Sequence, residues 1–364
     1  MRVAPLPLLS LLACTAGLTE VPAGSRRHLY GAVESSSKGT ARVKVPVDPL
    51  DSSLLVTAQV PEPWAVHVRA LHAPDGTEVF RAFEWNASPY NKTNGGFVST
   101  VATLNWPVSA TDAPLLPGKW EVELGVVDGS QQYTRQQVAV DVVLKKDASF
   151  ESGALEVTVV YTGGVQDDPG LRDAVEEAKV LWQELYGSFG IDLSFARDMG
   201  YPTDIGPPAL GDEEAYERIA AQTGIPHVNL VISNEIVGFE QIFGIAGDIP
   251  GPLVPTTRSG VQVSAVLAAG PDGKYSAEDV RLLSETMAHE TAHFLGLFHP
   301  VESSWETWDV LNDTAECDSE ASCKVELGEN LMFPFPVCSV VSCVPQNQVT
   351  AEQAEVVHRY TGVD

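Results

Sequence analysis

The chain has 364 residues, of which 44% are hydrophobic, and its formal net charge at pH 7 is −27. This length predicts two globular domains, and the hydrophobic fraction is enough for a core of ordinary size. The acidic balance argues against a nucleic-acid-binding protein and against adhesion to an anionic membrane, because like charges repel. No apolar run after the N-terminus reaches the roughly 20 residues of a membrane-spanning helix, so we expect none.

The N-terminus has the character of an export signal. An apolar stretch from Val3 to Ala13 follows Arg2 and is too short to span a bilayer. Its end, Leu-Leu-Ala-Cys14, resembles a bacterial lipobox, in which the cysteine becomes the lipidated first residue. We predict a signal peptide over residues 1–14, lipidation of Cys14 and a tether over 15–27. The alternative is an ordinary secretory signal with an incidental cysteine.

Either signal places the protein outside the cytoplasm. We expect a bacterial outer-membrane or cell-surface lipoprotein, or else a secreted protein. Contact with a membrane is then expected only through the lipid anchor.

Residues 28–146 contain short β-forming runs and no long helical periodicity. Several runs alternate apolar and polar side chains, as half-buried strands do. Turn-forming pairs such as Asp75-Gly76 and Asp128-Gly129 separate them. We therefore predict an antiparallel β-sandwich that serves as an accessory domain.

A second domain is expected over residues 153–364, because residues 145–153 change from an apolar strand to a polar linker. Apart from one short helix, its first half reads as a strand, a helix and three or four further strands before a long helix, and we expect an α+β fold. The expected strands are 155–161, 191–195, 228–232, 243–247 and 261–266, and the expected helices are 170–189, 213–222, one that begins near Ser276, and 350–360.

The helix that begins near Ser276 ends in the pattern His-Glu-x-x-His-x-x-Gly-x-x-His over residues 289–299. His289 and His293 are four residues apart, so both imidazoles project from one helix face and can bind one Zn²⁺. Gly296 can take the left-handed conformation that ends the helix and returns His299 as a third ligand. Three protein ligands leave a fourth position open, which is typical of catalytic zinc.

Glu290 is adjacent to the first of these ligands. A carboxylate there can polarise a water molecule and accept its proton. The alternative is a helix whose histidines are ordinary core or surface residues. His358, on the last predicted helix, is interpreted as structural rather than as a ligand.

This pattern resembles the zinc signature of the metzincin endopeptidases. That family carries a methionine turn below the zinc, for which Met332 in Asn-Leu-Met332 is the candidate; the alternative is an ordinary core methionine. This turn and the segment 309–317 look like the pappalysin-like branch, whereas Pro300 is more like the serralysins. Position 334 is proline where some relatives carry a tyrosine that reaches the zinc, so no fifth ligand is expected.

The resemblance covers about residues 153–364. It implies a metzincin-like catalytic domain with a mixed sheet, a zinc helix and a Met-turn. By analogy, residues 333–336 are expected to wall the pocket for the side chain after the scissile bond. Residues 243–247 are expected to form an edge strand that pairs with the substrate.

Four cysteines besides Cys14 follow the predicted zinc helix: Cys317, Cys323, Cys338 and Cys343. In an exported chain such cysteines indicate disulfides rather than a four-cysteine zinc site. The short spacings favour the pairs 317–323 and 338–343. A cross-pairing that ties the two loops together is equally open.

The sequence thus predicts a zinc-dependent endopeptidase with one Zn²⁺ per chain and a protein or peptide substrate. The alternative is a surface-anchored binding lipoprotein, in which the β-sandwich is the working part and the peptidase domain is latent or inactive. Calcium is compatible with the acidic stretch 309–329, but the sequence contains no EF-hand to support it.

Overall fold

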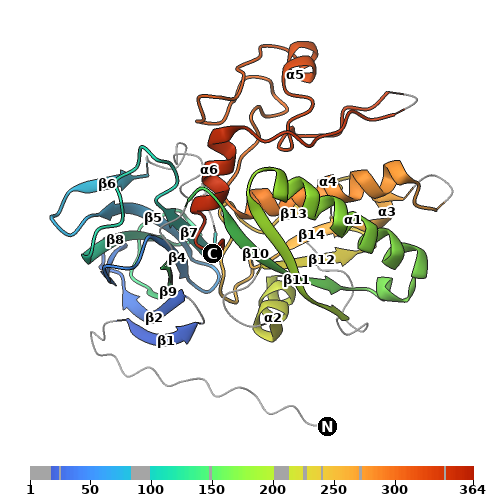
Figure 1. The fold of residues 1–364 in the computed structure, drawn as a ribbon. Coiled ribbons are helices and arrows are strands. Elements are labelled where there is room, and N and C mark those ends of the chain that lie inside the picture. Colours follow the sequence, from blue (N-terminus) through green and yellow to red (C-terminus); the bar gives the residue numbers. More distant parts are fainter. Residues whose placement is uncertain are drawn as a thin grey trace, which may run out of the picture.

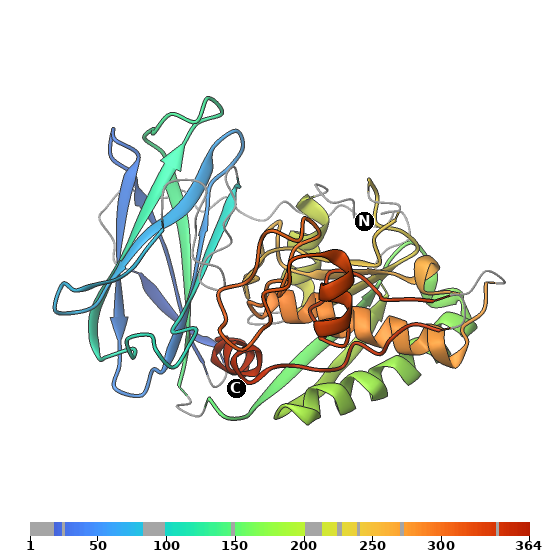
Figure 2. The same ribbon diagram turned by 90° about the horizontal axis from the view of Figure 1, so that it is seen from above.

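A computed structural model of the chain describes residues 18–23, 26–82, 99–146, 150–200, 213–223, 228–238, 241–269, 273–339 and 342–364. The predicted signal peptide and the lipidation of Cys14 lie outside these residues. Most of the predicted tether over residues 15–27 lies inside them, and its residues 19–23 and 26–27 belong to strands of a sheet rather than to a free linker. Two lobes lie side by side, which we call the N-terminal lobe (residues 18–146) and the C-terminal lobe (residues 150–364) (Figures 1 and 2).

The N-terminal lobe consists of antiparallel strands, as the alternating runs predicted. Its strands are β1 (Thr19–Ala23), β2 (Arg26–Glu34), β3 (Thr40–Val47), β4 (Ser53–Gln59), β5 (Ala65–His72), β6 (Glu78–Arg81), β7 (Val101–Trp106), β8 (Gly118–Val127) and β9 (Gln137–Lys145). They form one sheet in the order β1-β2-β9-β4-β7 and a second in the order β3-β8-β5-β6. Every pairing in both sheets is antiparallel.

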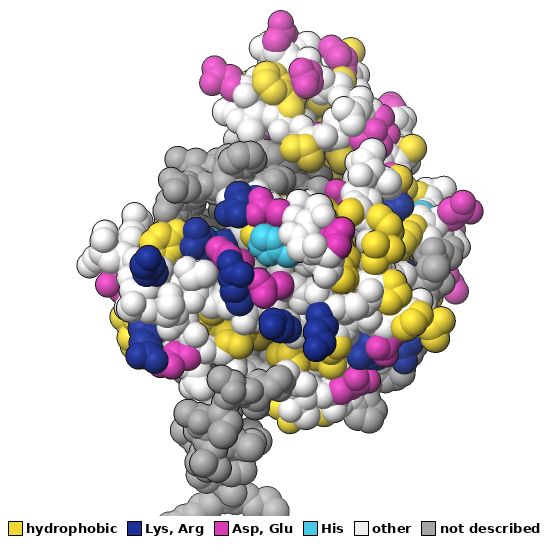
Figure 3. Space-filling model, turned by 90° about the vertical axis from the view of Figure 1, so that its left-hand side faces the viewer, with side chains coloured by type: hydrophobic (Ala, Val, Ile, Leu, Met, Phe, Trp, Pro, Cys, Tyr) yellow, Lys and Arg dark blue, Asp and Glu magenta, His cyan; other side chains and the backbone are white. Residues whose placement is uncertain are grey.

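Side chains from the two sheets share one core, in which Trp120 of β8 is completely buried beside residues of β4 and β9. The opposite face of the β3-β8-β5-β6 sheet is charged. Arg42 bonds Glu121 and Glu123 across it, and Lys and Arg side chains are prominent on this side of the molecule (Figure 3). The alternation along β3, with Val43 buried and Arg42 exposed, separates the two environments.

The C-terminal lobe is built on a mixed sheet in the order β11-β10-β12-β14-β13. All of its pairings are parallel except that of β13 with β14, so β13 is an antiparallel edge strand. Its elements are β10 (Gly153–Tyr161), η1 (Val165–Asp167), α1 (Pro169–Ser188), β11 (Ile191–Gly200), α2 (Glu213–Thr223), β12 (Val228–Ser233), β13 (Gly244–Ala246), β14 (Val261–Ser264), α3 (Ala265–Ala268), α4 (Ala277–Phe294), α5 (Glu320–Glu326) and α6 (Ala351–Arg359).

Helices cover both faces of this sheet. The chain therefore combines helices with a mixed sheet and with antiparallel sheets, in agreement with the predicted α+β class. Val157 and Val159 of β10 pack in the core that includes α1 and α4, whereas Val160 belongs to a separate cluster with Tyr216 of α2. Successive strand residues point to opposite faces, so these contacts place α2 on the other side from α1 and α4. The hydroxyl of Tyr186 on α1 donates to the carbonyl of Ala288 on α4 at 2.9 Å.

Helix α4 begins where the sequence predicted. The Ser276 side chain accepts a hydrogen bond from the backbone of Asp279, and the Asp279 side chain accepts one from the backbone of Ser276. This capping box fixes the start of a helix of 18 residues, whose last turns carry His289 and His293 of the predicted metal motif. None of the helices in the described part of the chain has the length and hydropathy needed to cross a membrane.

The two lobes share a continuous apolar core, which the sequence did not predict. Leu55, Val108 and Val143 of the N-terminal lobe pack in the main cluster of the C-terminal lobe. Polar contacts add to it, since Asn105 Oδ1 accepts hydrogen bonds from the backbone N–H and the hydroxyl of Thr361, at 2.9 and 2.8 Å. Helix α6 and the C-terminal residues therefore lie between the lobes (Figure 1).

Candidate metal centre

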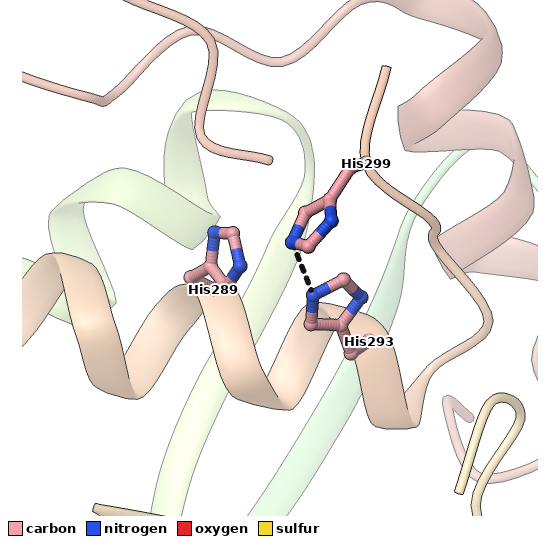
Figure 4. A group of neighbouring side chains, drawn as sticks. All are labelled: His289, His293 and His299. Carbon is pink, nitrogen blue, oxygen red and sulfur yellow. Dashed lines mark hydrogen bonds between the residues drawn. The ribbon is translucent and has the colours of Figure 1, made fainter. Parts of the chain in front are cut away.

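Three imidazoles converge at the end of α4. His289 and His293 lie on the helix, His299 lies on the segment that follows, and one ring nitrogen from each lies within 4.8 Å of the other two. The rings point toward a common space (Figure 4). Among the residues that the structure describes, no second group of His, Cys, Asp or Glu is arranged to hold a metal ion.

Gly296 makes this convergence possible. Its φ of +113° lies in the region that favours glycine, and the backbone N–H of Leu297 donates to the carbonyl of Ala292 at 3.0 Å. A Cβ at Gly296 would come no closer than 3.4 Å to Val356, so the backbone conformation rather than space requires glycine. The predicted role of this residue as the end of the helix is confirmed.

Each imidazole has a partner at its Nδ1 atom. Nδ1 of His289 lies 2.7 Å from the carbonyl oxygen of Leu331, and Nδ1 of His293 lies 2.7 Å from that of Leu297. A carbonyl oxygen can only accept, so both Nδ1 atoms donate and both Nε2 atoms keep a lone pair. This orientation of metal-binding imidazoles by a second hydrogen bond is common in proteins.

The Nε2 atoms of His293 and His299 lie only 3.1 Å apart. With both rings neutral and Nδ1 of His299 bonded to Glu302 at 3.1 Å, two lone pairs would face each other. A cation between the rings stabilises such an arrangement, and three neutral imidazoles form a donor set that suits Zn²⁺. The residues present therefore fit a zinc ion.

Burial keeps two of these rings in the neutral form that binds metal. It lowers the pKa of His289 to about 3, with a further decrease from the neighbouring His299. Burial also lowers the pKa of His293 far below the usual range, and the adjacent His289 and His299 add to this effect. Neither ring has to lose a proton at pH 7 before it can bind a metal.

Glu290 lies beside the imidazoles, facing strand β13. Burial raises the pKa of Glu290 to about 8, whereas a hydrogen bond from the backbone N–H of Ala246 acts in the opposite direction. A bound divalent cation would stabilise the carboxylate and lower this pKa. A bound cation would therefore favour the carboxylate form, which is the form that accepts a proton.

These residues open onto a cavity of about 590 Å³. Its lining comes from β13 with the segment before it, from α4, and from the segment Phe333–Pro336, which was predicted to wall a pocket. The acidic side chains in its described lining are Glu285, Glu290 and Glu302, and this lining contains no Lys or Arg.

Met332 directly follows Leu331, whose carbonyl oxygen orients His289. It is completely buried, and its backbone N–H donates to Asn330 Oδ1 at 2.8 Å. Asn330 Nδ2 in turn donates to Gln353 Oε1 of α6 at 2.9 Å. Sequence reasoning included Asn330 in the candidate turn but assigned no role to its side chain.

Both disulfides are local. Cys317 is bonded to Cys323 and Cys338 to Cys343, so the pairing between neighbours is found and the cross-pairing is not. Cys343 is also bound to α4, because its N–H donates to Glu278 Oε1 at 2.6 Å. The Cys338–Cys343 disulfide lies just after the cavity-lining segment Phe333–Pro336 in the chain.

Comparisons with known proteins give weak similarities only. No protein-family model matches the sequence, and no curated protein matches it significantly. Among solved structures, archaemetzincin from Methanopyrus kandleri is 15% identical with a TM-score of 0.28, over 57% of this chain and 88% of that one. Metalloproteinase-II from Bacteroides fragilis is 10% identical with a TM-score of 0.33, over 60% of this chain and 62% of that one. These identities and TM-scores are too low to support an assignment, so the assignment of a metal site depends on the geometry of the three imidazoles.

Proposed function

We propose that this protein is a zinc-dependent endopeptidase, with His289, His293 and His299 as the ligands of one Zn²⁺. The convergence of three imidazoles, each oriented through its Nδ1 atom, is the observation that carries the proposal. A carboxyl group and a cavity large enough for a peptide lie beside them. Together these features supply the parts that peptide hydrolysis requires.

When bound, Zn²⁺ would polarise the scissile carbonyl and lower the pKa of a water molecule. The chain's own contribution is proton transfer by Glu290. Its carboxylate takes the proton of the attacking water and passes it to the leaving amine. Strand β13 lies directly against the Glu290 side chain and helps to hold it beside the imidazoles.

Strand β13 supports the binding of an extended substrate. It is the last strand of its sheet, so its outer edge has no strand partner among the described residues. An extended peptide can pair with such an edge through backbone hydrogen bonds. The segment Phe333–Pro336 would then receive the side chain that follows the scissile bond.

Charge favours cationic substrate segments. Residues 150–364 contain nine Lys or Arg and 35 Asp or Glu, against 13 and 14 in residues 1–149. Nearly all of the net negative charge therefore belongs to the lobe that holds the cavity. An acidic cleft attracts basic peptides over long range, so cleavage of basic peptides should decrease as the salt concentration rises.

The remaining assignments complete the proposal. Met332 forms the floor beneath the zinc, and residues 153–364 form a metzincin-like catalytic domain close to the pappalysin-like branch. Residues 28–146 form an accessory β-sandwich that shares its core with that domain. Two disulfides support export of the protein, and lipidation of Cys14 would anchor it. The intact donor set does not favour the alternative of an inactive peptidase domain.

Substitution of Glu290 by Gln tests the proposal. The variant should retain zinc, because Glu290 is not a ligand, while cleavage of a casein-like substrate falls by about 100-fold or more. Glu306→Gln, at an exposed position outside the cavity lining, is the matched control and should cleave normally. A Glu290→Gln protein that cleaves as fast as the parent would show that Glu290 is not the general base.

A further inference from the structure

Strand β13 passes over Glu290 at a separation that only glycine permits. A Cβ atom built at Gly244 would lie 2.9 Å from both Cδ and Oε1 of Glu290, and closer still to Cγ. Real Cβ atoms do not approach other heavy atoms below 3.0 Å. The clash includes Cγ, in the middle of the Glu290 side chain, so rotation of the carboxylate group alone would not relieve it.

The strand has little freedom to move away. Gly244 pairs with Val263 and Ala246 with Val261 in the antiparallel ladder with β14. The ladder is closed at both ends, where Ser264 N–H donates to Phe243 O at 2.8 Å and Gly247 N–H donates to Gly260 O at 2.8 Å. A side chain at position 244 would therefore displace Glu290 more easily than it would displace the strand.

This approach brings the backbone of β13 directly against the Glu290 side chain. Gly244 leaves room for the middle of that side chain, so the strand can lie beside it. From these contacts we infer that Gly244 is a positioning residue, which allows the edge strand to hold the Glu290 carboxylate beside the three imidazoles. The inference rests on the proposed role of Glu290.

The substitution Gly244→Ala tests this role without straining the backbone. The φ of Gly244 does not lie in the positive region, so the backbone itself accepts an L-residue without strain. The nearest atoms to the added methyl group all belong to Glu290. A suitable control is Gly187 in α1, where φ is also not positive and a Cβ would meet nothing within 4 Å.

The experiment compares Gly244→Ala and Gly187→Ala in the full chain. Both variants should bind one zinc per chain and should not lose their fold. Gly244→Ala should lower kcat about tenfold or more with little change in KM, because a general base contributes about 10² to 10⁴ to the rate. Gly187→Ala should match the parent in both constants.

A double variant separates positioning from a general weakening of the strand. In a Glu290→Gln background, Gly244→Ala should cause almost no further loss of kcat, because the residue that it displaces is already inactive. An undiminished second loss would overturn the inference. So would a Gly244→Ala protein with normal kcat.

Crystal structures of the parent and of Gly244→Ala give a readout that does not need activity. The inference predicts that the Glu290 carboxylate moves away from position 244 in the variant while the three imidazoles stay in place. An unmoved carboxylate would overturn it. If the zinc-loaded parent cleaves no peptide, the proposed function fails, and the structures still decide the role of Gly244.

Discussion

Nδ1 of His289 lies 2.7 Å from the carbonyl oxygen of Leu331, the residue before Met332. The first imidazole of the metal motif is therefore oriented by a turn 42 residues later in the chain. Asn330 holds that turn, since its Oδ1 accepts the Met332 N–H and its Nδ2 donates to Gln353 of α6. Helix α6 thus supports the metal centre without contacting it.

Asn330→Ala should weaken zinc binding by about 10-fold to 100-fold, as is common when the support of a metal-binding imidazole is removed. The variant loses the anchor of the turn that positions the Leu331 carbonyl. Competition with a chelator measures the affinity. Asn312→Ala, which removes an exposed amide bonded to Glu352, is the control and should bind zinc as the parent does. Equal affinities in all three proteins would contradict this account of the turn.

Asn105→Ala should decrease the free energy of unfolding by about 2 to 4 kcal/mol, because it leaves buried groups at the lobe interface without partners. Asn105 accepts two hydrogen bonds from Thr361 and donates to the carbonyl of Arg359 at 3.0 Å. Urea unfolding of the full chain measures the change. Asn234→Ala, at an exposed position, should change it by less than about 0.5 kcal/mol. A loss no larger than this at Asn105 would mean that the interface is not structural.

Replacement of both Cys338 and Cys343 by Ser should lower the free energy of unfolding by about 2 kcal/mol, the amount expected for a short loop. Zinc binding should persist, because neither cysteine contacts the imidazoles. KM should rise, because Arg281 Nη2 donates to Cys343 O at 3.0 Å and the disulfide keeps that anchor next to the cavity wall. If both KM and the free energy of unfolding were unchanged, the disulfide would not stabilise the segment that lines the cavity.

Asp309 should make stability depend on pH. Burial raises its pKa to about 6 in the folded protein, despite hydrogen bonds from Thr314 and Leu311 that lower it, and its Oδ2 is buried without a partner. The unfolded carboxyl titrates near pH 4, to within about half a unit. The folded state therefore holds the proton more tightly, and this contribution to stability is full below about pH 4 and is lost as pH rises through about 6.

Asp309→Asn should remove this dependence. At pH 7 the variant should be more stable than the parent by up to about 2 kcal/mol, because no charge has to be buried. Urea unfolding at a series of pH values between 4 and 7 gives the comparison. Parallel curves for parent and variant would show that Asp309 titrates normally.

Local signals in the sequence were enough for the metal motif. The spacing of His289 and His293 needs only helical geometry, the Ser276 cap needs only its immediate neighbours, and Gly296 needs only its own φ. Each of these features is decided within a few residues, so the sequence predicted them correctly.

The contacts that the sequence could not predict depend on distant segments. Gly244 and Asn330 look ordinary until the fold brings β13 over Glu290 and α6 under the turn. One feature of the sequence is related to the core that the two lobes share, namely the continuous apolar run Val142-Val143-Leu144 in β9. Such a run indicates a strand buried on both faces, but it does not reveal which element covers the second face.

Metal removal and restoration tests the central claim most directly. The native full-length protein should contain one zinc per chain, and mass spectrometry of a peptide library should show defined cleavage sites. Removal of the metal with a chelator should abolish these cleavages, and one equivalent of Zn²⁺ should restore them in the parent but not in His299→Ala. Undiminished cleavage by metal-free protein, or full restoration in His299→Ala, would contradict the account.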